Sequence, residues 1–334
     1  MSTALATQER LQEALTMTLE ERSPGYQDLV SNSNVILHTL KQHGAWQTFD
    51  GGATIRETLR YGRIDSYKRY SQMDFLNPKT GQIFNDAEFH PKLAAVSLAI
   101  PMEEVLKNSG GNMIKDLVAG KIEAAEDELV DKFVEDLHGS GSLENQIAGL
   151  QAAIPTINDS GMYGGIDRGD HAVWRTGSYD VASDIPGVTE INKDTVKKIF
   201  RHITIEHMRG NDCPYLIVCS TEHYNAYAEA LEGIQRITNE NSTVGKGGFT
   251  HLIFNGAGKE QIVTLEGGKG SSMPANTSYF ISPKNLKVRM HSARNFTQFG
   301  NNNGPTNQDG IVRHVGFFGN LTMNNPLFMA KAYG

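Results

Sequence analysis

Apolar residues recur at helical spacing over residues 113–138, and this is the most regular pattern in the chain. The apolar positions are Ile114, Leu117, Val118, Ile122, Ala125, Leu129, Phe133 and Leu137. Side chains three and four positions apart fall on one face of an α-helix. The pattern therefore predicts one long amphipathic helix. Its other face is acidic and carries Glu123, Glu126, Asp127, Glu128, Asp131, Glu135 and Asp136.

A Gly/Ser stretch at 139–142 follows this helix and predicts a domain boundary. Beyond it, helical and strand patterns alternate. Residues 192–210 and 220–233 predict helices, and residues 215–219 predict a buried strand between them. Further strands are predicted at 249–254, 261–265, 278–282, 286–291, 311–318 and 327–330. The order of these elements predicts an α+β fold with an α/β unit in its second half.

The first hundred residues are organised differently. Residues 1–33 are polar with a thin helical stripe, which predicts an arm that needs a partner surface. Residues 54–61 and 66–73 predict two strands joined by a turn at 62–65, and residues 87–100 predict another strand. The predicted hairpin is too polar to bury a face on its own core, and an isolated hairpin is marginally stable in water. We therefore expect it to pack on another surface or to stay mobile.

Composition narrows the class of protein. The chain has 334 residues, 39% of them apolar and 21% charged, as in ordinary globular proteins. No apolar run approaches the roughly 20 residues that span a bilayer, and the first residues do not have the pattern of a secretory signal. The net charge of −7 argues against tight binding of nucleic acid. Cys213 and Cys219 do not have a zinc-site spacing, so we expect two buried thiols in a reducing compartment.

Candidate catalytic and metal motifs fail on their spacing. His202 and His207 are five positions apart in a His-Ile-Thr-Ile-Glu-His run, which fits neither H-E-x-x-H nor H-x-x-E-H. The glycine-rich run at 245–248 lacks the frame of a phosphate-binding loop, and no G-x-S-x-G motif is present. The sequence therefore predicts no catalytic residue, no metal site and no cofactor.

The segment 149–175 carries a resemblance to a known family. It reads Gly-Leu-Gln-Ala-Ala-Ile-Pro at 149–155, Tyr-Gly-Gly-Ile-Asp-Arg at 163–168 and Trp-Arg at 174–175. This resembles a run found in major capsid proteins of tailed bacteriophages. The hairpin, the stretch at 103–110, the long helix and the strand at 214–218 with its following helix also occur in the family's order. The resemblance covers residues 30–334.

The resemblance implies the HK97-like capsid fold with four parts. They would be an N-terminal arm at 1–33, an extended E-loop hairpin at 51–75, a peripheral (P) domain and an axial (A) domain. The P domain would comprise 34–50, 76–140 and 286–334 and hold the long spine helix, and the A domain would comprise 141–285.

The family's function would make the chain a structural protein and not an enzyme. It would assemble through pentamers and hexamers into an icosahedral shell around double-stranded DNA, in the cytoplasm of a bacterial host, and it would reside in the virion. A separate scaffolding protein, a portal and loose proximity to DNA are the expected partners, with no membrane. Maturation from a round precursor could use the 139–142 stretch as a hinge.

Two groups of residues are singled out by this resemblance. Five hairpin cations would pair with acidic surfaces of the adjacent subunit: Arg56, Arg60, Arg63, Lys68 and Arg69. Six motif residues are expected to have structural roles, with positive φ at the glycines and a packing role for the tryptophan: Gly164, Gly165, Ile166, Asp167, Arg168 and Trp174.

Several alternatives stay open at this point. An encapsulin-like nanocompartment shell has the same fold, and an unrecognised α/β hydrolase is a rival from another class. The acidic face of the long helix is either a plain solvated face or a lining that keeps packed DNA from adhering.

Overall fold

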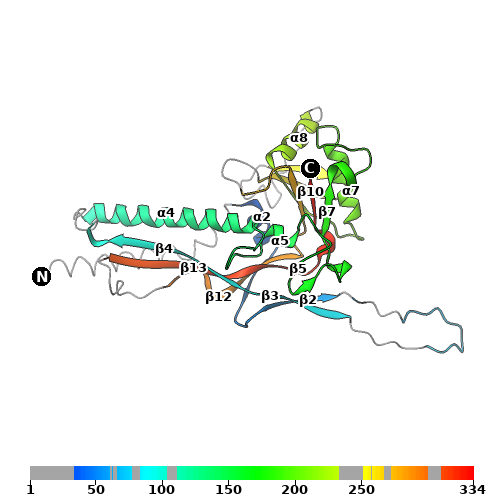
Figure 1. Cartoon of the computed structure of the whole chain (residues 1–334), viewed down its shortest axis with the longest axis horizontal. Coiled ribbons are helices and arrows are strands. Elements are labelled where there is room, and N and C mark those ends of the chain that lie inside the picture. The colour runs from blue at the N-terminus through cyan, green and yellow to red at the C-terminus, as the bar shows by residue number, and fades with distance from the viewer. Residues whose placement is uncertain are drawn as a thin grey trace.

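The computed structural model describes residues 34–60, 62, 66–76, 83–103, 111–232, 251–256, 258–266, 272–299 and 310–334. The predicted arm, 1–33, and Arg63 lie outside these residues. The described chain contains a four-stranded sheet with a long helix along it, a six-stranded sheet with helices packed on it, and a hairpin that projects away from both (Figure 1). This arrangement confirms the predicted α+β class.

The four-stranded sheet has the order β1-β12-β13-β4. Its strands are Trp46–Phe49 (β1), Leu286–Phe299 (β12), Gly310–Met323 (β13) and Lys92–Pro101 (β4). Helix α2 (Val35–Gln42) precedes β1, and the Asn34 side chain caps it by accepting the Ile36 and Leu37 amides. Neither α2 nor β1 was predicted, because each is too short to show a clear period in the sequence.

The long helix α4 (Gly111–His138) runs along this sheet, which confirms the strongest sequence prediction (Figure 1). Its buried face includes Ile122, Leu129, Phe133 and Leu137. The Phe133 ring packs edge-on against two rings of the sheet, with centroid distances of 5.5 Å to Phe296 and 5.1 Å to Phe317. On the opposite face four carboxylates are exposed: Asp127, Glu128, Asp131 and Glu135.

The six-stranded sheet has the order β7-β14-β11-β8-β10-β9. Its strands are Gly177–Asp180 (β7), Ala330–Tyr333 (β14), Thr277–Ile281 (β11), Leu216–Cys219 (β8), Glu260–Leu265 (β10) and His251–Asn255 (β9). Helices α7 (Val196–Glu206) and α8 (Thr221–Glu232) pack on it, and Phe200 of α7 is fully buried against Phe254 and Phe280. The predicted α/β unit is present, with its strands shifted by a few residues at most.

The C-terminal segment divides between the two sheets, in contrast to the expectation that 286–334 completes one sheet. Strands β12 and β13 do lie in the four-stranded sheet, but β14 pairs with β11 and β7 in the other. The predicted strand at 327–330 is wrong: η2 (Pro326–Phe328) is a 3-10 turn, begun by a proline and capped by Asn325. Proline fixes φ and removes an amide donor, so the chain turns here before it enters the second sheet.

The hairpin pairs different segments from those predicted. Strand β2 (Ile55–Arg60) pairs with β3 (Phe84–Phe89), from Ile55 opposite Phe89 to Arg60 opposite Phe84. The second predicted strand, 66–73, is not a strand. The predicted strand at 87–100 instead covers the end of β3 and nearly all of β4, separated at residues 90–91, where a proline again interrupts the pairing.

Candidate functional site

The base of the hairpin is fixed to the four-stranded sheet through one buried carboxylate. Glu57 lies on the inward face of β2 and its side chain is 5% exposed. Lys287 Nζ and Arg289 Nε of β12 donate to its two oxygens at 3.0 and 2.7 Å, and Thr322 Oγ1 of β13 donates at 3.2 Å. This group ties the hairpin to two strands of the sheet, and we call it the Glu57 anchor.

The electrostatics of the Glu57 anchor favour the ionised carboxylate. Burial by itself would raise the pKa of Glu57, but the hydrogen bonds and charges of Arg289 and Lys287 outweigh that effect and hold the pKa below its ordinary value. The anchor is therefore an ion pair at neutral pH.

The predicted motif packs against strand β3 at the hairpin base. It forms a two-residue turn between β5 (Met162–Tyr163) and β6 (Ile166–Asp167). Gly164 and Gly165 occupy this turn with φ of +60° and +72°, the left-handed region in which only glycine is free of a Cβ penalty. A Cβ on Gly164 would lie 2.8 Å from the Phe89 ring of β3, so this glycine also permits the close approach of the two hairpins.

Arg168 and Trp174 hold the motif in place. The Arg168 guanidinium is buried and donates from Nη2 to the Ala152 and Ala153 carbonyls, at the end of α5 (Leu150–Ala153), at 2.8 and 2.9 Å. Trp174, in the 3-10 turn η1 (Ala172–Trp174), donates from Nε1 to the Tyr163 carbonyl at 2.8 Å and stacks on the Tyr163 ring.

The remaining motif residues have smaller roles: Ile166 is half-buried, and the exposed Asp167 accepts the Gly169 amide. These contacts fit the structural roles that the sequence predicted for the motif.

Two of the five predicted hairpin cations have acidic partners within the hairpin. Arg56 Nη2 lies 3.0 Å from Glu88 of β3, and Lys68 Nζ lies 3.8 Å from Asp74. Arg60 and Arg69 are exposed. The structure therefore does not bring the predicted cations together, and it leaves Arg60 and Arg69 as the described ones most open to another chain.

The described part of the hairpin loop exposes large apolar side chains, a feature that the sequence analysis missed. They are Tyr67, Tyr70, Met73, Phe75 and Leu76. Met73 and Phe75 are 94% and 93% exposed. Clustered exposed apolar groups mark contact surfaces. In the sequence these side chains stand as aromatic and apolar residues inside a polar run, whereas the contact predicted for the hairpin rested on its cations.

A serine–histidine contact between the six-stranded sheet and α8 resembles catalytic machinery but has no access to solvent. His223 Nδ1 lies 2.7 Å from Ser278 Oγ, which donates to Cys219 Sγ at 3.4 Å. All three side chains are buried. Burial lowers the pKa of His223 to about 4 and raises the pKa of Cys219 to about 12. These are features of a packed core and not of an activated nucleophile.

The histidine run at 202–207 has a packing role as well. The buried His207 contacts the Leu327 carbonyl through Nδ1 and the Tyr179 hydroxyl through Nε2. Among the described residues, no group of three or more His, Cys, Asp or Glu side chains is placed to hold a metal ion.

In the same part of the chain no helix is both long and apolar enough to cross a membrane. Of the two cysteines predicted to be buried, Cys219 is buried and Cys213 is half-buried.

The sequence matches no protein-family model and no curated protein. The structure is similar to solved capsid structures. The cyanophage A-1(L) capsid asymmetric unit has a TM-score of 0.66 at 14% identity, over 88% of this chain and 92% of that chain. The capsid of an empty GTA particle has a TM-score of 0.51 at 8% identity, over 87% and 95%. The SrpI encapsulin of Synechococcus elongatus has a TM-score of 0.49 at 8% identity, over 88% and 86%.

The chain therefore has the HK97-like capsid fold, as the resemblance of its sequence implied.

Proposed function

We propose that this chain is the major capsid protein of a tailed bacteriophage and assembles through pentamers and hexamers into an icosahedral shell around double-stranded DNA. The observation that carries the proposal is the hairpin. The Glu57 anchor fixes its base to the four-stranded sheet, while the described part of its loop exposes large apolar side chains. A projection with a rigid base and an apolar end fits a contact with a neighbouring subunit.

The parts of the fold take corresponding roles in this proposal. The four-stranded sheet with α4 forms the P domain, the six-stranded sheet with α7 and α8 forms the A domain, and β2, β3 and the loop between them form the E-loop. The segment 1–33 acts as the N-terminal arm. The stretch 139–142, between α4 and the A domain, is the hinge candidate for maturation of the shell.

The chemistry of the chain fits a wall that encloses DNA without gripping it. The net charge is −7, and the exposed carboxylates of α4 would repel phosphates. In this role the protein needs no catalytic residue and no cofactor. It resides in the virion after assembly in the bacterial cytoplasm, where a separate scaffolding protein and a portal take part.

Electron microscopy of the chain expressed alone tests the proposal, with size-exclusion chromatography of the same sample. We expect closed shells, capsomer rings or tubes. Subunits that stay monomeric or dimeric even with the cognate scaffolding protein would contradict a shell function. The contents of native particles separate the two kinds of shell: double-stranded DNA supports the phage capsid, and an enclosed protein cargo would identify a nanocompartment instead.

Charge reversal at the two exposed hairpin arginines, Arg60→Glu with Arg69→Glu, is expected to abolish particles and leave soluble, folded subunits. Exposed ion pairs contribute about 0–1 kcal/mol each, so the single reversals should assemble. The double change reverses both charges at the same contact, and this larger cost is repeated at every subunit contact. The measurement is the particle yield in electron micrographs, with circular dichroism as the check of folding.

A matched control for this pair is Lys193→Glu with Arg201→Glu, which makes the same change of charge at exposed positions of the proposed A domain. The control should assemble. Intact particles from the hairpin variant would show that the hairpin does not act through its charges, without affecting the assignment as a shell protein.

A further inference from the structure

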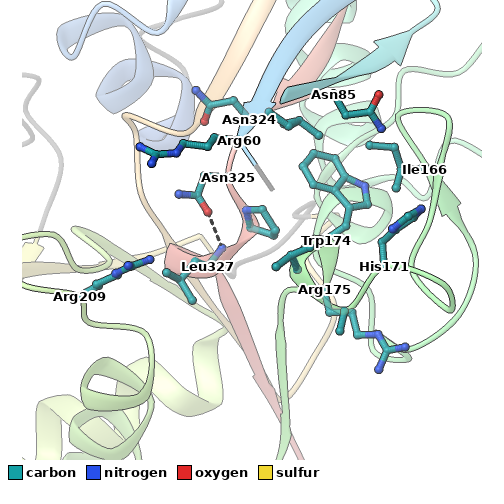
Figure 2. A pocket seen from close by; sticks show the side chains of 14 residues that line it. Arg60, Asn85, Ile166, His171, Trp174, Arg175, Arg209, Asn324, Asn325 and Leu327 are labelled. Atoms are coloured by element: carbon teal, nitrogen blue, oxygen red, sulfur yellow. Dashed lines mark hydrogen bonds between the residues drawn. The ribbon is translucent and has the colours of Figure 1, made fainter. Parts of the chain in front are cut away.

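A cavity of about 530 Å³ lies where three segments meet: the hairpin base, the motif region and the turn before β14. Its apolar lining includes Leu59 of β2, Trp174 of η1 and Leu327 of η2. Figure 2 shows Trp174 and Ile166 on one side of the cavity, with Arg60, Arg209 and Leu327 across from them. Cavities of this size hold drug-sized ligands, so one or two large side chains would fit.

The charged side chains that line this cavity are all positively charged. Arg60, Arg175 and Arg209 line it together with His171, and no Asp or Glu is among its lining residues. Arg175 is already held by the carbonyls of Arg168 and Gly169, whereas Arg60 and Arg209 are exposed. An apolar interior with a cationic rim fits a segment that carries apolar side chains next to a carboxylate.

We propose that this cavity receives residues 73–76 of the hairpin loop of a second copy of the chain. This segment reads Met-Asp-Phe-Leu and is the described part of the loop that combines apolar side chains with a carboxylate. Met73 and Phe75 are almost fully exposed, and Leu76 is more than half exposed. The Asp74 carboxylate accepts the Ser71 amide at 3.3 Å and lies 3.8 Å from Lys68 Nζ. Both contacts are exposed, and the ion pair is weak, so the carboxylate can bind an arginine on the rim instead.

The segment must come from another copy because of where it lies. Residues 66–76 project beyond β2 and β3, at the far right of Figure 1, while the cavity lies at the base of the same hairpin. Loop to base is a head-to-tail contact between unlike surfaces, the kind that closes into rings when the rotation between copies is suitable. The closed ring of such contacts rests on the proposed shell function. The contact adds to that function the surface of the neighbouring subunit that receives the hairpin loop.

A disulfide cross-link tests this contact. Phe75→Cys places a thiol on the loop, and Val173→Cys places one on an exposed lining residue of the cavity. Particles of the double variant, after mild oxidation, should give a ladder of linked chains on a non-reducing gel. The matched control joins Phe75→Cys to Leu143→Cys. Leu143 is exposed to a similar degree as Val173 but does not line the cavity. The single variants Phe75→Cys and Val173→Cys show how much of the cross-linking comes from the native Cys213.

The outcomes separate this inference from the shell function. Intact particles in which the cavity pair cross-links no better than the control pair would overturn the docking site and leave the shell function standing. If the chain forms no particles, a mixture of Phe75→Cys chains and Val173→Cys chains, distinguished by tags, tests docking between free subunits. A mixed dimer in clear excess over the Leu143→Cys mixture supports the contact, and equal yields overturn it.

Discussion

Replacing Glu57 by glutamine is expected to lower the free energy of unfolding of the subunit by about 2–3 kcal/mol. The substitution keeps the shape of the side chain but leaves Lys287 and Arg289 without a counter-charge, and it points an amide NH₂ at a cation. Loss of one partner of a fully buried pair costs about 3–5 kcal/mol. The value here is lower because the Lys287 and Arg289 side chains keep 18% and 21% of their surface exposed.

Urea unfolding of unassembled subunits at neutral pH measures this effect. The matched control is Glu88→Gln, which removes the partner of Arg56 from the same hairpin. That pair is exposed, with side chains 65% and 45% accessible, so its loss should change the free energy of unfolding by less than about 1 kcal/mol. Equal effects of the two substitutions would show that the Glu57 anchor does not fix the hairpin to the sheet.

The pH dependence of the same comparison follows from the lowered pKa of Glu57. In the unfolded chain this carboxyl binds a proton near its ordinary pKa, whereas the folded protein binds it only at lower pH. Between these two values the unfolded state holds more protons, so stability rises with pH there. The stabilisation is complete above the ordinary pKa and is lost as pH falls through the lowered one. The difference between the wild type and Glu57→Gln should therefore shrink on acidification.

Long regular patterns explain what the sequence predicted well. The apolar period of α4 extends over about seven turns, and its residues Leu129, Phe133 and Leu137 are buried as the period requires. The strand β8 was recognisable because all four of its residues are apolar, which is typical of a strand buried on both faces.

Short or irregular elements explain what the sequence did not predict. Strand β3 buries only Ala87 and Phe89 of its six residues, so its sequence shows little alternation, and the pattern favours the run at 66–73 in its place. The break at residues 90–91 and the turn at Pro326 each contain a proline, which ends the regular pairing there. The placement of β14 in the second sheet depends on long-range pairing, which no local pattern carries.

The candidate site also contains some features that the sequence could predict and others that it could not. The glycines of the motif could be assigned to a turn because positive φ is a local property. The Glu57 anchor could not be predicted, because Glu57 and Arg289 are separated by 232 positions in the sequence. The cavity likewise combines residues from β2, η1 and η2, and only the fold brings them together.

The passage from α4 into the segment that follows it depends on another glycine. Gly149 precedes α5 and lies against the C-terminal end of α4. A Cβ at this position would lie within 2.7 Å of three backbone carbonyl oxygens, those of Asp136, Leu137 and Gly139. Real Cβ atoms do not come this close to a carbonyl oxygen, and the backbone at a helix end cannot turn aside as a flexible side chain would. The chain on the two sides of the Gly/Ser stretch is therefore closely packed in this state, and the hinge motion suggested for the proposed shell would have to separate these surfaces.

Gly149→Ala is accordingly expected to lower the free energy of unfolding by at least about 3 kcal/mol, the upper range for overpacking, or to prevent soluble expression. Its matched control is Gly120→Ala, in the exposed middle of α4, where a Cβ meets nothing within 4 Å. Alanine costs less conformational entropy than glycine in a helix, so this control should stabilise the subunit by about 0.5–1 kcal/mol. Soluble yield and urea midpoints of the two variants measure the difference. A Gly149→Ala subunit with the midpoint of the wild type would show that the end of α4 and the following segment can part without loss, which would favour the stretch at 139–142 as a free hinge.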